Sequence, residues 1–134
     1  MGHRPIPQMF DEEKKEDLFR PISVDKLLGI MKSFKKHKCP GPDDWTIDFF
    51  IHFFYLIKHD LLRMVEATRI SRSIHHIMTS TQIALIPNKS EADSFKDFRP
   101  ISLCNITFKI ITKIIAERIK PTLVYFLTRI NMLF

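Results

Sequence analysis

The sequence is poor in glycine and cysteine. Its 134 residues include only 3 Gly, which argues against Gly-rich phosphate loops and against a turn-dense β-sandwich or β-barrel. The 2 cysteines, Cys39 and Cys104, form no CxxC pair and are too few for a disulfide framework, so we expect two reduced thiols. Aspartate is also absent from the chain after Asp97.

Long apolar segments are absent as well. The most apolar stretch, residues 49–57, contains His52 and is far shorter than the roughly 20 apolar residues that a membrane span needs. Residues 1–20 are charged and contain prolines, which is unlike a signal peptide. We therefore expect an intracellular protein, in the nucleus or the cytoplasm, that is neither secreted nor embedded in a membrane.

The remaining composition fits one folded domain behind a short leader. Hydrophobic residues make up 45% of the chain and include 12 Phe, which argues against intrinsic disorder. Residues 1–20 are predicted to be a poorly ordered leader with one helical turn at most, and residues 21–134 to be the folded part.

Apolar residues at helical spacing predict two helices in the first half of the chain. Ser23 is a plausible N-cap for the first, which must stop at residues 39–44 because two prolines and a glycine cannot continue a helix. A second, strongly buried helix is predicted over residues 46–68. Its four clustered phenylalanines are expected to pack in the core rather than to stack on bases: Phe49, Phe50, Phe53 and Phe54.

The second half of the chain predicts a hairpin and a third helix. Residues 81–87 and 98–103 are the two strands, joined by a long polar loop. The third helix begins with Asn105 or Thr107 as its cap, and Pro121 either kinks or restarts it. The predicted fold class is therefore α+β, mostly helical, with one short antiparallel β-hairpin.

Positive charge is concentrated near the end of the chain. The formal net charge is +6, and from Arg99 onward Glu117 is the single acid among six basic residues. This distribution favours a polyanionic partner, although a solvated helix face is an equally good interpretation. The candidates for nucleic-acid binding are Lys109, Lys113, Arg118 and Lys120.

Three blocks of sequence carry a specific resemblance. Residues 38–43 read KCPGPD, residues 81–87 read TQIALIP, and residues 97–105 read DFRPISLCN. In this order and spacing, the blocks resemble the N-terminal part of the reverse transcriptase of plant non-LTR (LINE-type) retrotransposons, over roughly residues 22–127. The resemblance implies the fingers and the opening of the palm of a right-hand polymerase.

The resemblance also implies a nucleotide-binding role for the hairpin. Arg99 matches the arginine that holds the triphosphate of the incoming nucleotide; the alternative is that Arg99 pairs with Asp97 or Asp43 and fastens the hairpin. The family's second triphosphate cation is a lysine directly after the L-I-P strand. Asn88 stands at that place here, and Lys89 follows one residue later, so Lys89 is the substitute candidate.

A second departure falls in the first block. Asp44 replaces the family's glycine, and aspartate is one of the few residues that tolerates a positive φ there. The adjacent Asp43 and Asp44 are expected to form a turn and a helix cap rather than a metal site. The histidines show no zinc-like spacing either.

The family's catalytic motifs are missing. The resemblance places Mg²⁺ on one palm aspartate and on a Tyr/Phe-Ala-Asp-Asp hairpin further along, and this chain contains neither. We therefore expect it to bind no cofactor and to be inactive by itself, although its family is an RNA-directed DNA polymerase that uses dNTPs on an RNA or DNA template-primer. Two alternatives remain: a small, basic, non-enzymatic nucleic-acid-binding relic of a decayed element, and a piece that hardly folds and aggregates through apolar residues of its third helix.

Overall fold

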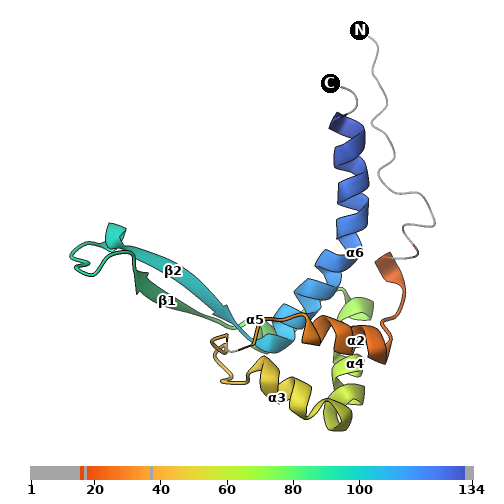
Figure 1. Ribbon diagram of the computed structural model, residues 1–134. Helices are drawn as coiled ribbons and strands as arrows, with labels where there is room; N and C mark the ends of the chain where they lie inside the picture. The colour runs from red at the N-terminus through yellow and green to blue at the C-terminus, as the bar shows by residue number, and fades with distance from the viewer. Residues whose placement is uncertain (1–15, 17, 37, 132–134) are drawn as a thin grey trace. The chain divides into compact units, whose positions relative to one another are not determined.

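The computed structural model describes residues 16, 18–36 and 38–131, with side chains up to residue 128 (Figure 1). The chain divides into two compact units. One comprises residues 22–111, and the other combines the residues up to 21 with those from 112 onward. Most of the predicted leader lies outside the described residues.

The first long helix of the larger unit is α2, Val24–Lys32. Ser23 caps it as predicted, because its side chain accepts a hydrogen bond from the Lys26 backbone N–H at 3.2 Å. Its buried face carries Leu27, Ile30 and Met31. The helix ends at Ser33, whose backbone N–H donates to the carbonyls of the preceding turn, so it stops before the proline-rich turn.

The predicted second helix is two helices, α3 (Ile47–His52) and α4 (Phe54–Ser71). Phe53 separates them, with φ −94° and ψ 13°. The sequence around the break is apolar on all sides and defines no single buried stripe, so helical spacing could not reveal the bend. The bend buries Phe50 and Phe54 but leaves Phe53 41% exposed and Phe49 half-buried. The prediction that all four clustered phenylalanines pack in the core was therefore wrong for Phe53 and only partly right for Phe49.

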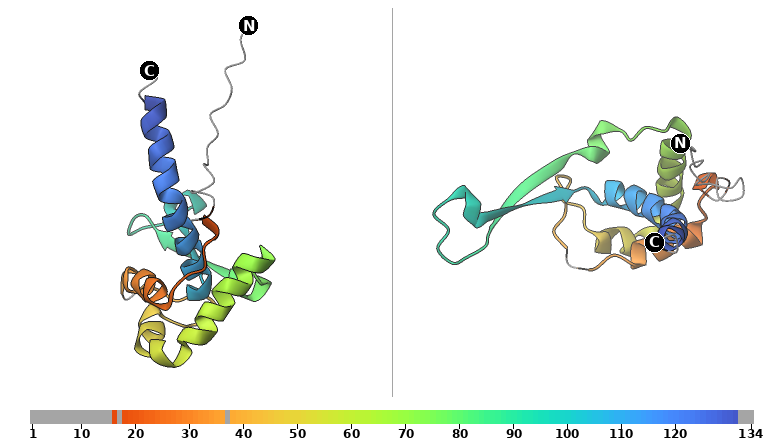
Figure 2. Two further views of the ribbon diagram at one scale, coloured as in Figure 1. Left: turned by 90° about the vertical axis from the view of Figure 1, so that its right-hand side faces the viewer. Right: turned by 90° about the horizontal axis from the view of Figure 1, so that it is seen from above.

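The hairpin forms where the sequence placed it. Strands β1 (Thr81–Pro87) and β2 (Phe98–Cys104) pair antiparallel, in a register that runs from Thr81 opposite Cys104 to Pro87 opposite Phe98. A one-turn helix, α5 (His76–Thr79), precedes β1, and a 3-10 turn, η1 (Phe95–Asp97), leads into β2. Figures 1 and 2 show the two strands side by side as a ribbon. Nearly every residue of β1 is exposed, and Ile83, at 69%, is the most exposed of its large hydrophobic residues.

The last helix, α6 (Ile106–Asn131), contributes to both units. Its first turn starts from the carbonyl of Asn105, which accepts a hydrogen bond from the Lys109 N–H at 3.1 Å. The helix continues through Pro121. Together these elements make an α+β fold that is mostly helical with one two-stranded antiparallel sheet, as predicted. Among the described residues, no helix is long and apolar enough to cross a membrane.

Candidate nucleotide and nucleic-acid interface

Two of the three sequence blocks meet at the buried side chain of Asn105. This side chain is 4% exposed and uses both ends of its amide. Its Oδ1 accepts a hydrogen bond from the Asp43 backbone N–H at 3.3 Å, and its Nδ2 donates to the Ile77 carbonyl at 3.1 Å. A buried amide with both ends bonded adds stability and fixes geometry. Asn105 therefore joins the turn before α3, the short α5 and the start of α6.

The turn before α3 fits against Asn105 only because it contains glycine. A Cβ added to Gly41 would lie 2.5 Å from the backbone N and the Oδ1 of Asn105, and 2.5 Å from the carbonyl carbon of Cys104. Real Cβ atoms do not approach other atoms so closely, and two of these three atoms are backbone. The glycine of the first block is thus required by packing against the third block.

The same turn shows how aspartate replaces a second glycine. The Asp44 N–H donates to the Gly41 carbonyl at 3.1 Å, and the Asp43 carboxylate accepts from the Trp45 N–H at 3.2 Å. Asp44 has φ 57°, the left-handed conformation that the sequence predicted for this position. Asp43 acts as a turn-forming residue, and within the described part of the chain no group of three metal-binding side chains gathers.

Arg99 lies on β2, exposed to solvent. It stands opposite Ile86 of β1, and directly opposite residues of an antiparallel pair share one face of the sheet. Neither proposed acidic partner holds it: the Asp97 carboxylate binds Lys89, the Asp43 carboxylate accepts from the Trp45 N–H, and no ion pair of Arg99 occurs among the described residues. Its guanidinium is therefore exposed on the hairpin and forms no ion pair with a described residue that would hold the hairpin to the rest of the larger unit.

Lys89, the other candidate for the triphosphate, forms part of the hairpin loop. Its ammonium lies 3.1 Å from Oδ1 of Asp97. Oδ2 of Asp97 accepts from the backbone N–H groups of Asp93 and Ser94, at 3.2 and 3.1 Å, and its carbonyl accepts from the Asn88 N–H at 2.7 Å. The Asp97 carboxylate thus ties the loop together, with Lys89 as its cation.

The basic residues predicted on the third helix do not all lie on one side of it. Lys113 and Lys120 are seven residues apart on α6, so they lie on the same side of the helix, whereas Arg118 lies on the other side. Lys109 lies in the first turn of α6 and is half-buried.

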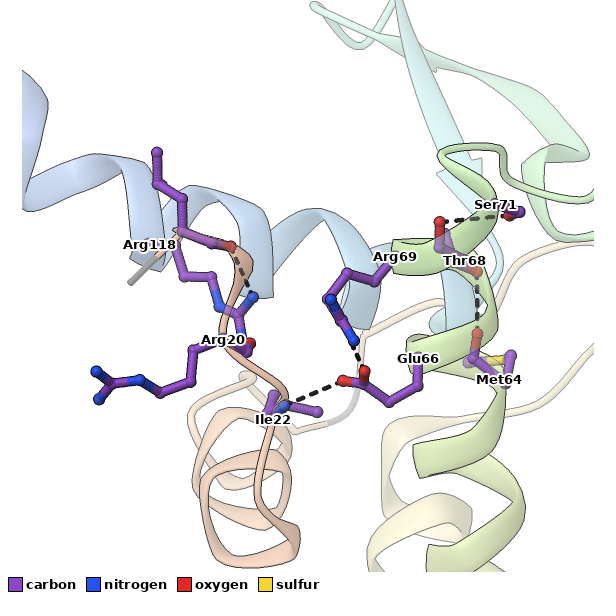
Figure 3. A network of polar contacts seen from close by, with 9 residues as sticks. Arg20, Ile22, Met64, Glu66, Thr68, Arg69, Ser71 and Arg118 are labelled. Atoms are coloured by element: carbon purple, nitrogen blue, oxygen red, sulfur yellow. Dashed lines mark hydrogen bonds and ion pairs between the residues drawn. The ribbon is translucent and has the colours of Figure 1, made fainter. Parts of the chain in front are cut away.

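The Arg118 guanidinium instead binds the backbone. It donates to the carbonyl of Leu18 at 2.9 Å and to the carbonyl of Arg20. Figure 3 shows Arg118 beside Arg20. All three residues belong to the smaller unit. Arg118 therefore fastens the segment before α2 to α6, a role that helical spacing could not indicate because its partners lie about 100 residues away in the sequence.

A second polar network lies within the larger unit. The Oε1 of Glu66, on α4, accepts a hydrogen bond from the Ile22 N–H at 3.0 Å, and its Oε2 forms an ion pair with Nε of Arg69 at 2.6 Å (Figure 3). Ile22 itself is buried. Glu66 therefore holds the entry to α2 against α4, a contact that no local sequence pattern indicated.

The chain is similar to a transposon protein. It is 30% identical over 112 residues, 84% of its length, to the Transposon TX1 uncharacterized 149 kDa protein of Xenopus laevis. The aligned part makes up 9% of that protein, so the chain spans less than a tenth of its relative. The chain matches no protein-family model. Similarity over most of the chain supports its derivation from a transposable element.

Proposed function

We propose that the chain is the fingers and first palm segment of a reverse transcriptase from a plant-type non-LTR retrotransposon. One observation carries the proposal: the DFRPISLCN block presents Arg99 on an exposed hairpin, while Asn105 at its end ties the hairpin to the Pro-Gly-Pro turn. The similarity to a transposon protein supports the same origin.

In this proposal, Arg99 binds the triphosphate of an incoming dNTP. A guanidinium offers a planar fork of donors that matches phosphate oxygens, and this one has no acidic partner among the described residues to compete with a phosphate. Lys89 is the second cation, but it must leave Asp97 to reach a phosphate. A triphosphate at this site would therefore compete with the Asp97 carboxylate and loosen the hairpin loop.

Catalysis itself needs residues that this chain does not contain. Phosphoryl transfer depends on positioning and on metal charge, and a two-metal centre needs carboxylates from different elements. The described residues include no such group, so they do not fit a magnesium centre. We propose that Mg²⁺ belongs to the palm of the full-length enzyme and that this chain by itself does not polymerise.

The template-primer is the second proposed ligand. Lys113 and Lys120 share one side of α6 and are suited to following a phosphate backbone. Lys109, in the first turn of α6, is a separate candidate. Arg118 has two of its donors on backbone carbonyls, so those donors must leave the carbonyls before they can bind a phosphate.

The same surface supports the alternative function, a non-enzymatic nucleic-acid-binding relic. Both functions predict RNA binding that weakens with salt, because phosphate contacts release counterions. Only the reverse-transcriptase proposal predicts a triphosphate site at Arg99, so the two are separable.

Titration of a fluorescent dNTP by anisotropy tests the triphosphate site. The change is Arg99→Ala, and Arg63→Ala is the matched control because Arg63 is an exposed arginine on α4, away from the hairpin. We expect Arg99→Ala to weaken binding about tenfold, the value of a lost charge-assisted hydrogen bond, and Arg63→Ala to bind normally. Equal affinities in the two variants would leave only the relic interpretation.

Titration of single-stranded RNA over a range of salt concentrations tests the nucleic-acid surface. The double change Lys113→Glu and Lys120→Glu is expected to weaken binding and to lower the salt slope by about 0.7 per lost phosphate contact. Lys35→Glu with Lys36→Glu, at exposed positions after α2, is the control. RNA affinity that responds neither to salt nor to these changes contradicts both functions.

A further inference from the structure

Three aromatic side chains form an ordered row around α3. The ring centroids of Trp45 and Phe49 are 4.2 Å apart, and those of Phe49 and Phe53 are 4.8 Å apart. Trp45 is 47% exposed and Phe53 41% exposed. We call Trp45, Phe49 and Phe53 the aromatic row.

The row runs along α3 and past both of its ends. Phe49 lies within α3, Trp45 directly precedes the N-cap Thr46, and Phe53 is the C-cap residue, so ring contacts rather than helical spacing align the three. The His52 ring meets the edge of Phe53 at 4.9 Å and extends the same surface. Large apolar side chains gathered at a surface in this way are typical of a binding site rather than of scattered exposure.

The charged residues that adjoin the row in the sequence are acidic. Residues 39–57 contain Asp43, Asp44 and Asp48 but no Lys or Arg, in a protein whose net charge is +6. Asp44 directly precedes the row and is exposed, and Asp48 lies within it along α3. Carboxylates at this position repel a phosphate backbone and attract a cation.

Aromatic faces and carboxylates together select one kind of ligand. A Lys or Arg side chain gains from the face of a tryptophan and from a carboxylate at once. Leucine-like side chains at helical spacing pack on a row of rings, as amphipathic helices do when they dock on apolar surfaces. Bases of single-stranded RNA can stack on exposed rings, but the carboxylates beside these rings repel its phosphates. The proposed triphosphate and template contacts use neither the rings nor these carboxylates.

We propose that the aromatic row is a docking surface for a basic amphipathic helix of a partner protein. Apolar side chains of that helix cover Phe49 and Phe53, and its cations face Asp44, Asp48 and the ring of Trp45. This surface lies on α3 and is independent of whether the hairpin binds a nucleotide.

The full chain offers a direct reporter, because Trp45 is its single tryptophan. The probe is a synthetic peptide of about 18 residues, five helical turns, with leucines on one face and lysines on the other. The control peptide has glutamate in place of each lysine. Since the chain has a net positive charge, nonspecific attraction favours the control peptide, whereas the proposed surface favours the lysine peptide.

We expect a saturable change in Trp45 fluorescence with the lysine peptide and none with the glutamate peptide. The double variant Asp44→Asn and Asp48→Asn should weaken the binding about fivefold to tenfold, as expected for two solvent-accessible ion pairs, one at the exposed Asp44 and one at the half-buried Asp48. Glu91→Gln with Glu117→Gln removes the same charge at exposed positions elsewhere and should leave the affinity unchanged. Phe53→Ala should also weaken binding, whereas Ile83→Ala on the exposed hairpin should not.

Three results would overturn the proposal. Equal binding of the two peptides, or full affinity in the Asp44/Asp48 variant, removes the charge argument. Saturable quenching of Trp45 by a single-stranded oligonucleotide identifies a base-stacking surface instead. Concentration-dependent dimerisation that Phe53→Ala abolishes identifies a second copy of the chain as the occupant. Far-UV circular dichroism of each variant verifies that it is folded.

Discussion

Replacing Gly41 with alanine tests the packing of the first block against the third. The new methyl group would lie 2.5 Å from backbone atoms of Cys104 and Asn105, so the turn must move away from Asn105. Overpacking of this kind costs about 1–3 kcal/mol. Loss of the Asn105 hydrogen bond to the Asp43 N–H destabilises the fold by about 1 kcal/mol more. Alanine also reduces the conformational entropy of the unfolded chain, which offsets about 0.5 kcal/mol of this loss. We expect a net loss of about 1.5–3.5 kcal/mol.

Urea denaturation followed by circular dichroism measures this loss as a lower midpoint at unchanged slope. The matched control is Gly29→Ala. Gly29 lies in α2, and a Cβ there meets nothing within 4 Å. Alanine should therefore stabilise that helix by about 1 kcal/mol, because glycine is the poorer helix former. The two substitutions are chemically identical and are predicted to act in opposite directions.

The reasoning fails if Gly41→Ala unfolds at the same urea concentration as the parent protein, or if the two alanine variants behave alike. The first outcome would mean that the turn does not rest on Asn105. A parent chain that unfolds without a cooperative transition would instead support the interpretation that the chain hardly folds.

Two further substitutions test local geometry. Asp44→Gly should raise the free energy of unfolding by about 0.5–1 kcal/mol, because glycine adopts φ 57° without the steric cost that aspartate has. Urea denaturation measures this change, and a lower free energy of unfolding in the variant would contradict the proposed strain at Asp44. Asp97→Asn removes the charge that binds Lys89 and the amides of Asp93 and Ser94, so hydrogen exchange of these two amides should become roughly tenfold faster; unchanged protection would exclude Asp97 as the residue that holds the loop.

The sequence predicted elements whose signals are local. Alternation and β-branched residues before Pro87 placed the first strand correctly, and Ser23 marked the start of α2. The break at Phe53 escaped prediction because the apolar residues around it fit both a straight and a bent helix. Whether the helix is straight or bent at Phe53 depends on which of its apolar side chains other segments of the chain can bury.

Contacts between segments that are distant in the sequence could not be predicted from it either. Asn105 was predicted as a possible helix cap, and its carbonyl does accept the first hydrogen bond of α6. Its side chain, however, hydrogen-bonds to the backbones of Asp43 and Ile77. Arg118 looked like one cation of a basic surface, yet it binds backbone carbonyls. Helical spacing tells which residues share a side of an element, and it carries no information about what another segment brings there.

The position of Asn105 has a consequence for the order in which the larger unit assembles. Its bond to Ile77 closes a segment of 28 residues, and its bond to Asp43 closes one of 62. On chain entropy alone, the longer closure costs about 0.7 kcal/mol more than the shorter. The shorter segment also contains the hairpin, whose own pairing is local. The hairpin and the Ile77 contact should therefore form first, and the Pro-Gly-Pro turn should dock last, onto an asparagine that is already held in place.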